Sequence, residues 1–175
     1  SDRAGIVKVY EAVTQYCGFS AIEAGKTMGL FPYGKPNKEI PELFVHNGKG
    51  TLSNRNLIIP TYPNAALVNY DNFYSLEEKL ETNQSDLTEL QSRRDLAYAC
   101  QTDTQEEVRK LIYKAVEMTG KKKVVISGGY GLNCVANYYY LDTLRKDGIE
   151  IYVEPVSNDA GTAMGAALLY YYSLS

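Results

Sequence analysis

A cluster of glycines followed by an asparagine is the first candidate for binding chemistry. In the stretch KKKVVISGGYGLNCVANYYYL, residues 121–141, Gly128 and Gly129 end an apolar run, and Asn133 follows after a third glycine, Gly131. Glycine has no Cβ, so backbone N–H groups at a strand end can face a bound group directly. The alternative is that the glycines only make a tight strand-to-helix turn and that Asn133 only caps the helix.

A carboxylate occupies a similar place further along the chain. In EPVSNDAGTAMG, Asp159 precedes a run of small residues. A carboxylate suits Mg²⁺, and it also occurs in mixed ligand sets for iron or zinc. Asp is equally a good helix cap. The GKT of residues 25–27 is not a phosphate-binding P-loop, because no glycine lies five residues before Gly25. GGYGLN also lacks the GxGxxG spacing of dinucleotide-binding loops.

The elements that carry these residues can be predicted from periodicity. Apolar spacing predicts a helix over 4–17, which Gly18 ends, and a second helix over 93–118, which Gly120 ends. Between them, residues 18–36 hold too many glycines and prolines for one regular element. Short strands are predicted within 40–75, and a solvated helical or loop insertion is predicted over 76–92.

The last third alternates strand and helix. KVVISGG and IEIYVEP are strand patterns, and NCVANYYYLDTLRKDG and NDAGTAMGAALLYYYSL are helix patterns. This order favours parallel strands, whose carboxyl ends are where ligands bind in open α/β sheets. We expect the strands near Val124 and Ile151 to share one sheet, with both helices packed on it. A close-packed helix face is predicted from four small residues: Gly161, Ala163, Gly165 and Ala166.

Composition limits the class of protein. The chain has 175 residues, a net charge of −3 and three widely spaced cysteines. We therefore expect a single domain over residues 1–175 in a reducing, cytoplasmic setting, without nucleic-acid or membrane partners.

Several motifs taken together resemble a known family. ISGGYGLNCVAN followed by EPVSNDAGTAMGAAL resembles the carbamoyltransferase family that includes nodulation protein U and the antibiotic O-carbamoyltransferases. AVTQYCGFSAIEAGKTMGLFPYGKP and DLAYACQTDTQEEV are similar to two further blocks of that family. The resemblance covers most of the chain and is weakest over residues 40–90.

The resemblance implies a fold. The family has a domain similar to the tRNA-threonylcarbamoylation enzyme, built on the actin/Hsp70/sugar-kinase, ribonuclease H-like fold. The chain is then expected to be the C-terminal lobe of that α/β domain, with a mixed sheet and flanking helices. It would be a fragment of a larger protein, without the N-terminal lobe and the domain that forms carbamoyl-adenylate.

The resemblance also implies site residues. Adenine-nucleotide contacts map to Gly128, Gly129 and Asn133, and a metal ligand maps to Asp159. The other side of the nucleotide cleft maps to Glu23, Lys26 and Gly29. A solvated loop lysine is the alternative for Lys26.

The chain departs from the family pattern in places. Tyr130-Gly131 replaces the commoner Val-Ala, and Asn158 stands where the family usually has Gly. The family's metal site also uses two histidines, whereas the one histidine here, His46, lies in no such motif.

The implied reaction is transfer of a carbamoyl group from carbamoyl phosphate, through ATP and carbamoyl-adenylate, to a substrate hydroxyl. ATP and a divalent metal (iron, zinc or magnesium) are the implied cofactors, and the isolated chain is expected to be inactive. One alternative is a lobe of an actin-like ATPase or sugar kinase. Another is a non-catalytic binding or assembly module, which could form a homodimer through exposed Tyr and Leu.

Overall fold

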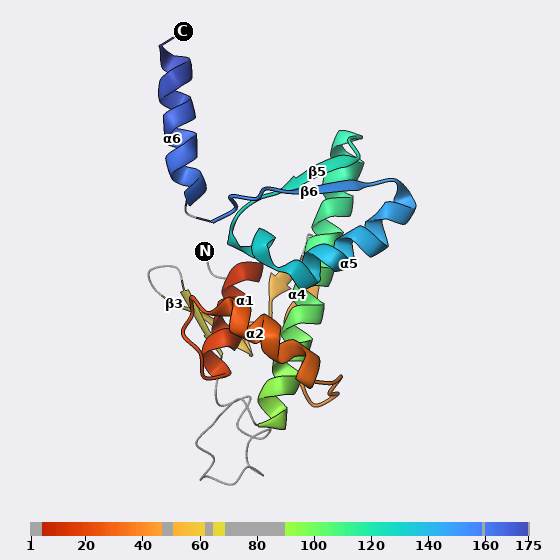
Figure 1. Ribbon diagram of the computed structural model, residues 1–175. Coiled ribbons are helices and arrows are strands. Elements are labelled where there is room, and N and C mark those ends of the chain that lie inside the picture. The colour runs from red at the N-terminus through yellow and green to blue at the C-terminus, as the bar shows by residue number, and fades with distance from the viewer. Residues whose placement is uncertain (1–4, 47–50, 62–64, 69–89, 159, 175) are drawn as a thin grey trace. The chain divides into compact units, whose positions relative to one another are not determined.

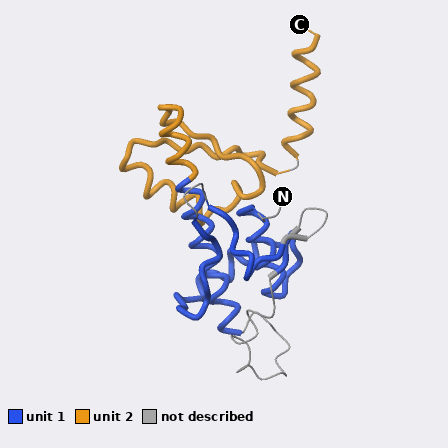
Figure 2. Tube along the Cα trace, turned by 180° about the vertical axis from the view of Figure 1, so that it is seen from behind, with its two compact units in different colours: residues 1–110 blue, residues 111–175 orange. Residues whose placement is uncertain are grey.

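The chain folds into two compact units. The computed structural model describes residues 5–46, 51–61, 65–68, 90–158 and 160–174. Unit 1 covers residues 1–110 and unit 2 covers residues 111–175 (Figure 2). The prediction of one domain over residues 1–175 stays a prediction.

Unit 1 combines helices with two small antiparallel hairpins (Figure 1). Its elements are α1 (Ile6–Tyr16), α2 (Ala24–Leu30), the 3-10 helix η1 (Phe31–Tyr33), β1 (Phe44–His46), β2 (Thr51–Ser53), β3 (Ile58–Thr61), β4 (Ala65–Val68) and α4 (Gln91–Thr119), whose last turns belong to unit 2. Strand β1 pairs with β2, and β3 pairs with β4. The predicted helices and the predicted strands are confirmed. Most of the predicted insertion at 76–92 lies outside the described residues.

The core of unit 1 forms around α1. Val9, Val13 and Cys17 are fully buried because their spacing places them on one helical face, which packs against α2 and β4. Gly18, with φ of 93°, ends the helix as predicted. Helix α2 was not predicted among the glycines of residues 18–36. The buried hydroxyl of Thr27 donates a 2.8 Å hydrogen bond to Thr14 Oγ1, which ties α2 to α1.

Unit 2 carries the alternating strands and helices. Its elements after α4 are β5 (Lys123–Ile126), the 3-10 helix η3 (Gly129–Leu132), α5 (Cys134–Leu144), the 3-10 helix η4 (Arg145–Asp147), β6 (Glu150–Val153) and α6 (Ala160–Ser173). Strands β5 and β6 pair in parallel, with Val124 opposite Ile151, so the predicted shared sheet is confirmed. The 3-10 turn η3 was not predicted.

Helix α5 covers one face of this sheet. It contacts β6 and buries Ala136, Tyr140 and Leu144 completely. On the strands, half-buried residues alternate with exposed ones, and the exposed positions include Val125 and Tyr152. The chain is thus a mixed α/β protein with small sheets and flanking helices. Its assignment to the actin-like, ribonuclease H-like fold stays a prediction.

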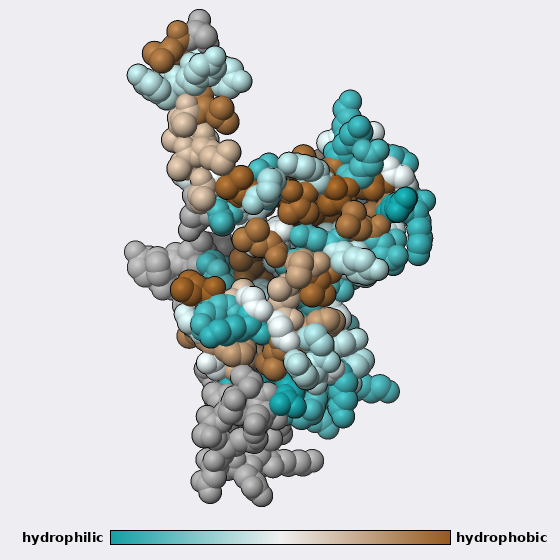
Figure 3. All heavy atoms as spheres, in the orientation of Figure 1, coloured by the Kyte–Doolittle hydropathy of each residue, from teal (hydrophilic) through white to brown (hydrophobic). Residues whose placement is uncertain are grey.

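Helix α6 differs from the prediction. None of its residues is buried among the described residues, so the close-packed face predicted for Gly161, Ala163, Gly165 and Ala166 is wrong here. Small residues permit close approach but supply little apolar area to drive it. The helix sequence AGTAMGAALLYYYS contains no charged residue, and Figure 3 shows no strongly hydrophilic side chain along it. In the described part of the chain, no helix combines the length and apolar character needed to cross a membrane.

Candidate functional site

The glycine loop follows the end of β5. Gly128 has φ of 95° and ψ of 167°, a backbone conformation that side chains with a Cβ rarely adopt. The η3 turn then closes through a 2.8 Å hydrogen bond from the amide of Gly131 to the carbonyl oxygen of Gly128. At Gly129, by contrast, an added Cβ would meet no atom within 4 Å. Gly128 is therefore required by the turn, whereas Gly129 leaves space in front of the loop.

The third glycine has a packing role. A Cβ on Gly131 would lie 3.3 Å from Ser157 Oγ and 3.4 Å from Ile126 Cγ2. Ser157 is buried, and its hydroxyl donates to the carbonyl oxygen of Glu154 at the end of β6. Gly131 thus lets the loop after β5 approach the loop after β6.

Asn133 caps α5. Its Oδ1 accepts a 3.0 Å hydrogen bond from the amide of Ala136, and the residue is 8% exposed. The capping role considered from the sequence is therefore confirmed. Asn133 does not line the cleft described next, and its contact with an adenine nucleotide stays a prediction.

A cleft opens at the carboxyl ends of the two parallel strands. Its volume is about 530 Å³, within the range of small-molecule sites. Gly128 and Gly129 form part of its wall, and their contact with a ligand stays a prediction. The remaining lining residues are Ser127, Glu154, Val156, Ser157, Asn158, Gly161, Thr162, Met164, Gly165 and Leu168. Sequence analysis did not select Ser127, Glu154 or Thr162, although Ser127 directly precedes the two glycines.

The cleft offers uncharged donors and one carboxylate. The first turns of α6 line it, and a helix N-terminus attracts negative charge. Asn158 Oδ1 accepts a 3.0 Å hydrogen bond from the amide of Ala160 at the start of this helix. Hydroxyl groups of Ser127 and Thr162 add donors, and Glu154 adds an acceptor. The wall thus suits a ligand with both an anionic group and hydroxyl groups.

The other predicted nucleotide residues lie on or beside α2, in unit 1. Lys26 Nζ is 2.5 Å from Glu23 Oε1 and 5.7 Å from the centre of the Phe19 ring. The hydrogen bond from Lys26, followed by that from the Ser20 amide, lowers the pKa of Glu23. Gly29 has open space where a Cβ would lie. The structure joins Glu23 with Lys26, and their role in a nucleotide cleft stays a prediction.

Comparison with known proteins identifies the family. Residues 3–168 match the carbamoyltransferase N-terminus family. The chain belongs to this family. The resemblance stated from the glycine and Asp159 motifs is thereby confirmed.

Curated proteins similar to this carbamoyltransferase-family chain include two nodulation proteins. It is 30% identical to nodulation protein NolNO of Sinorhizobium fredii (strain NBRC 101917 / NGR234) over 97% of this chain and 23% of that protein. It is 26% identical to nodulation protein NolO of Bradyrhizobium diazoefficiens over 91% of this chain and 27% of that protein. An uncharacterized protein of Synechocystis sp. is 32% identical over 94% of this chain and 27% of its own length. The chain spans about a quarter of the length of these relatives.

The metal expectation for this carbamoyltransferase-family chain rests on Asp159, which lies outside the described residues. Among the residues that are described, no group of three or more His, Cys, Asp or Glu side chains is arranged to hold a metal ion. The described side chains therefore do not form a complete metal site.

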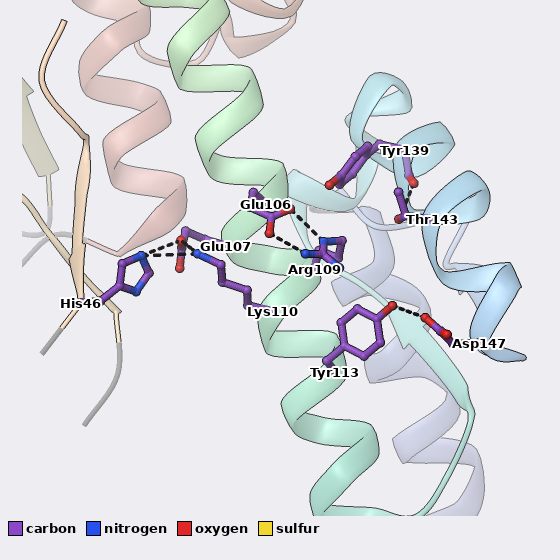
Figure 4. A network of polar contacts seen from close by, with 9 residues as sticks. All are labelled: His46, Glu106, Glu107, Arg109, Lys110, Tyr113, Tyr139, Thr143 and Asp147. Atoms are coloured by element: carbon purple, nitrogen blue, oxygen red, sulfur yellow. Dashed lines mark hydrogen bonds and ion pairs between the residues drawn. The ribbon is translucent and has the colours of Figure 1, made fainter. Parts of the chain in front are cut away.

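A small acidic groove of about 190 Å³ lies in unit 1 between β1 and α4. His46 Nε2 lies 3.4 Å from Glu107 Oε1, and Lys110 Nζ lies 2.7 Å from the same oxygen (Figure 4). Burial, followed by the nearby carboxylates of Glu42 and Glu107, raises the pKa of Asp103. His46 also lies within hydrogen-bond distance of two other groups, with Nε2 3.3 Å from Lys110 Nζ and Nδ1 3.0 Å from Thr51 Oγ1.

Proposed function

We propose that this chain binds the adenine nucleotide in a carbamoyltransferase that passes a carbamoyl group to a substrate hydroxyl. Family membership supports the reaction class. The observation that carries the proposal is the cleft at the ends of β5 and β6, where Gly128 and Gly129 face the first turns of α6. Ligands of open α/β sheets bind at such an edge.

Different residues of the cleft would bind different parts of the nucleotide. Backbone N–H groups of the glycine loop and the N-terminus of α6 would hold a phosphate, because both present positive partial charge. The carboxylate of Glu154 would repel a phosphate but accept hydrogen bonds from ribose hydroxyls. In carbamoyl transfer from carbamoyl-adenylate, these groups would bind and orient the adenylate part of the donor.

Further residues of the full-length protein complete the proposal. Glu23, Lys26 and Gly29 are proposed as further nucleotide contacts, with Lys26 acting as a point charge toward phosphate. Asp159 would supply one ligand to iron, zinc or magnesium, a metal that polarises the carbamoyl carbonyl when bound. The remaining metal ligands, the N-terminal lobe and the domain that forms carbamoyl-adenylate would come from other parts of the protein. Carbamoyl phosphate and a small molecule with a hydroxyl group are the proposed substrates.

Nucleotide titration of the full-length protein tests the proposal. Gly129→Val should weaken ATP affinity by about tenfold or more, because the new side chain fills the open space in front of the loop. Gly148→Ala is the matched control, because Gly148 has φ of 70°, which an alanine rarely adopts, and does not line the cleft. It should lower the melting temperature more than the affinity. Calorimetry that gives the same affinity for Gly129→Val and wild type would contradict the proposed site.

A further inference from the structure

The side chain of Asn137 in α5 binds the backbone of the glycine loop. Its Nδ2 donates a 2.7 Å hydrogen bond to the carbonyl oxygen of Gly131, six residues earlier in the chain. Asn137 is not among the residues that line the cleft. Its side chain therefore acts on the loop from the helix side.

The loop is anchored at several points around Gly131. The amide of Gly131 donates to the carbonyl oxygen of Gly128, and the amide of Asn133 donates to that of Tyr130 over 3.0 Å. Ser157 contacts the position where a Cβ of Gly131 would lie. With its carbonyl bound to Asn137, Gly131 is fixed through both backbone polar groups. The η3 turn held in this way begins at Gly129, directly after Gly128.

Stability alone does not explain an asparagine at this position. Within the described part of the chain, the other polar atom of the side chain, Oδ1, is buried and accepts no hydrogen bond. A buried polar atom without a partner costs about 1–3 kcal/mol, a penalty that leucine of similar size would avoid. The hydrogen bond from Nδ2 to the Gly131 carbonyl offsets the cost of burying Oδ1. This bond to the loop is what asparagine provides and leucine would not, so we infer that Asn137 shapes the loop.

We propose that Asn137 is a positioning residue that presets Gly128 and Gly129 for the adenine nucleotide, an inference that rests on the proposed function. Glycine-rich backbone loses more conformational entropy on ordering than any other, so a loop that is free before binding binds more weakly. A side chain that orders the loop beforehand raises affinity without touching the ligand.

The experiment uses full-length protein and three variants. Asn137→Leu and Asn137→Ala both remove the donor but differ in size, so an effect common to both belongs to the lost hydrogen bond. Thr143→Val is the matched control, because it removes a 2.7 Å side-chain bond to Tyr139 O on the same helix (Figure 4). Hydrogen exchange at the amides of Gly131 and Asn133, calorimetric titration with a non-hydrolysable ATP analogue and melting temperature are measured for each.

Both Asn137 variants should show faster exchange at these amides and about tenfold weaker affinity, with Thr143→Val like wild type. The melting temperature of Asn137→Leu should stay close to that of wild type. Unchanged exchange, or faster exchange with unchanged affinity, would overturn the proposal. If the wild type itself binds no ATP analogue, the proposed function fails, and the exchange rates alone then decide whether Asn137 holds the loop.

Discussion

The phenol of Tyr10 in α1 donates a 2.8 Å hydrogen bond to Oε1 of Gln101 in α4, 91 residues later in the chain. Both residues are buried. Tyr10→Phe should destabilise the protein by about 1–2 kcal/mol, because it leaves a buried amide oxygen with one donor fewer. Urea unfolding measures the change. Tyr138→Phe, at a position 74% exposed, is the control and should have little effect. Equal stability of both variants would mean that the bond contributes nothing measurable.

Two glycines of unit 1 should respond in opposite directions to the same substitution. A Cβ on Gly34 would lie 2.0 Å from the carbonyl oxygen of Arg94, so Gly34→Ala must displace backbone and should cost about 1–3 kcal/mol. At Gly25, inside α2, a Cβ would meet nothing within 4 Å. Gly25→Ala should stabilise the helix by about 0.5–1 kcal/mol. Thermal melts of the two variants check the prediction, and a loss of stability at both positions would contradict it.

The raised pKa of Asp103 predicts a pH effect on stability. In the folded protein, burial keeps the carboxyl protonated above the ordinary value of 3.8, so the folded state binds more protons than the unfolded state there. The contribution of Asp103 to folding stability is fully present below the ordinary pKa. It is lost as pH rises through the raised pKa. Asp103→Asn should remove the loss and increase stability at neutral pH. Unfolding midpoints over a series of pH values measure it.

Glu23→Gln should change stability at neutral pH in the direction opposite to Asp103→Asn. The pKa of Glu23 is lowered from 4.5, so its contribution is present above that value and is lost as pH falls through the lowered pKa. The variant should therefore lose stability at neutral pH relative to wild type and differ less in acid. A change in the same direction for both variants would show that the pH response comes from other groups.

The 175-residue chain on its own should not transfer carbamoyl groups. A stable zinc or iron site usually needs three or more protein ligands, and no such group is present among the described residues. Production of phosphate and carbamoylated product from carbamoyl phosphate and ATP is the measurement. Turnover above a protein-free control would refute the expectation, and the full-length protein is the positive control.

Elements with a strong period in the sequence were predictable. The apolar run before Gly128 and the one before Pro155 indicated strands, and the helix between them indicated that they pair in parallel. The glycines at 18, 120 and 148 adopt positive φ where helices were expected to end. The cleft at the strand ends followed from the same reasoning, because the position of a ligand in such sheets depends on topology.

Features that depend on contacts between distant residues were not predictable. Helix α2 is supported by the hydrogen bond between Thr27 and Thr14, and no local sequence pattern predicts this helix. Gly131 was considered for ligand approach, yet its space is set by Ser157, which lies 26 positions later. Glu154 and Thr162 enter the cleft through the turn between β6 and α6, whose path the sequence does not specify. The role of Asn137 depends on a turn, η3, that has no strong sequence signal.

Helix α6 also affects how the protein must be handled in solution. Its sequence contains no Asp, Glu, Lys, Arg or His. Adjusting pH or choosing buffers around the isoelectric point will therefore not mask this exposed apolar surface. Salts such as sulfate strengthen apolar association, so they would promote self-association of the isolated chain. The exposed helix therefore calls for purification at low concentrations of weakly salting-out ions.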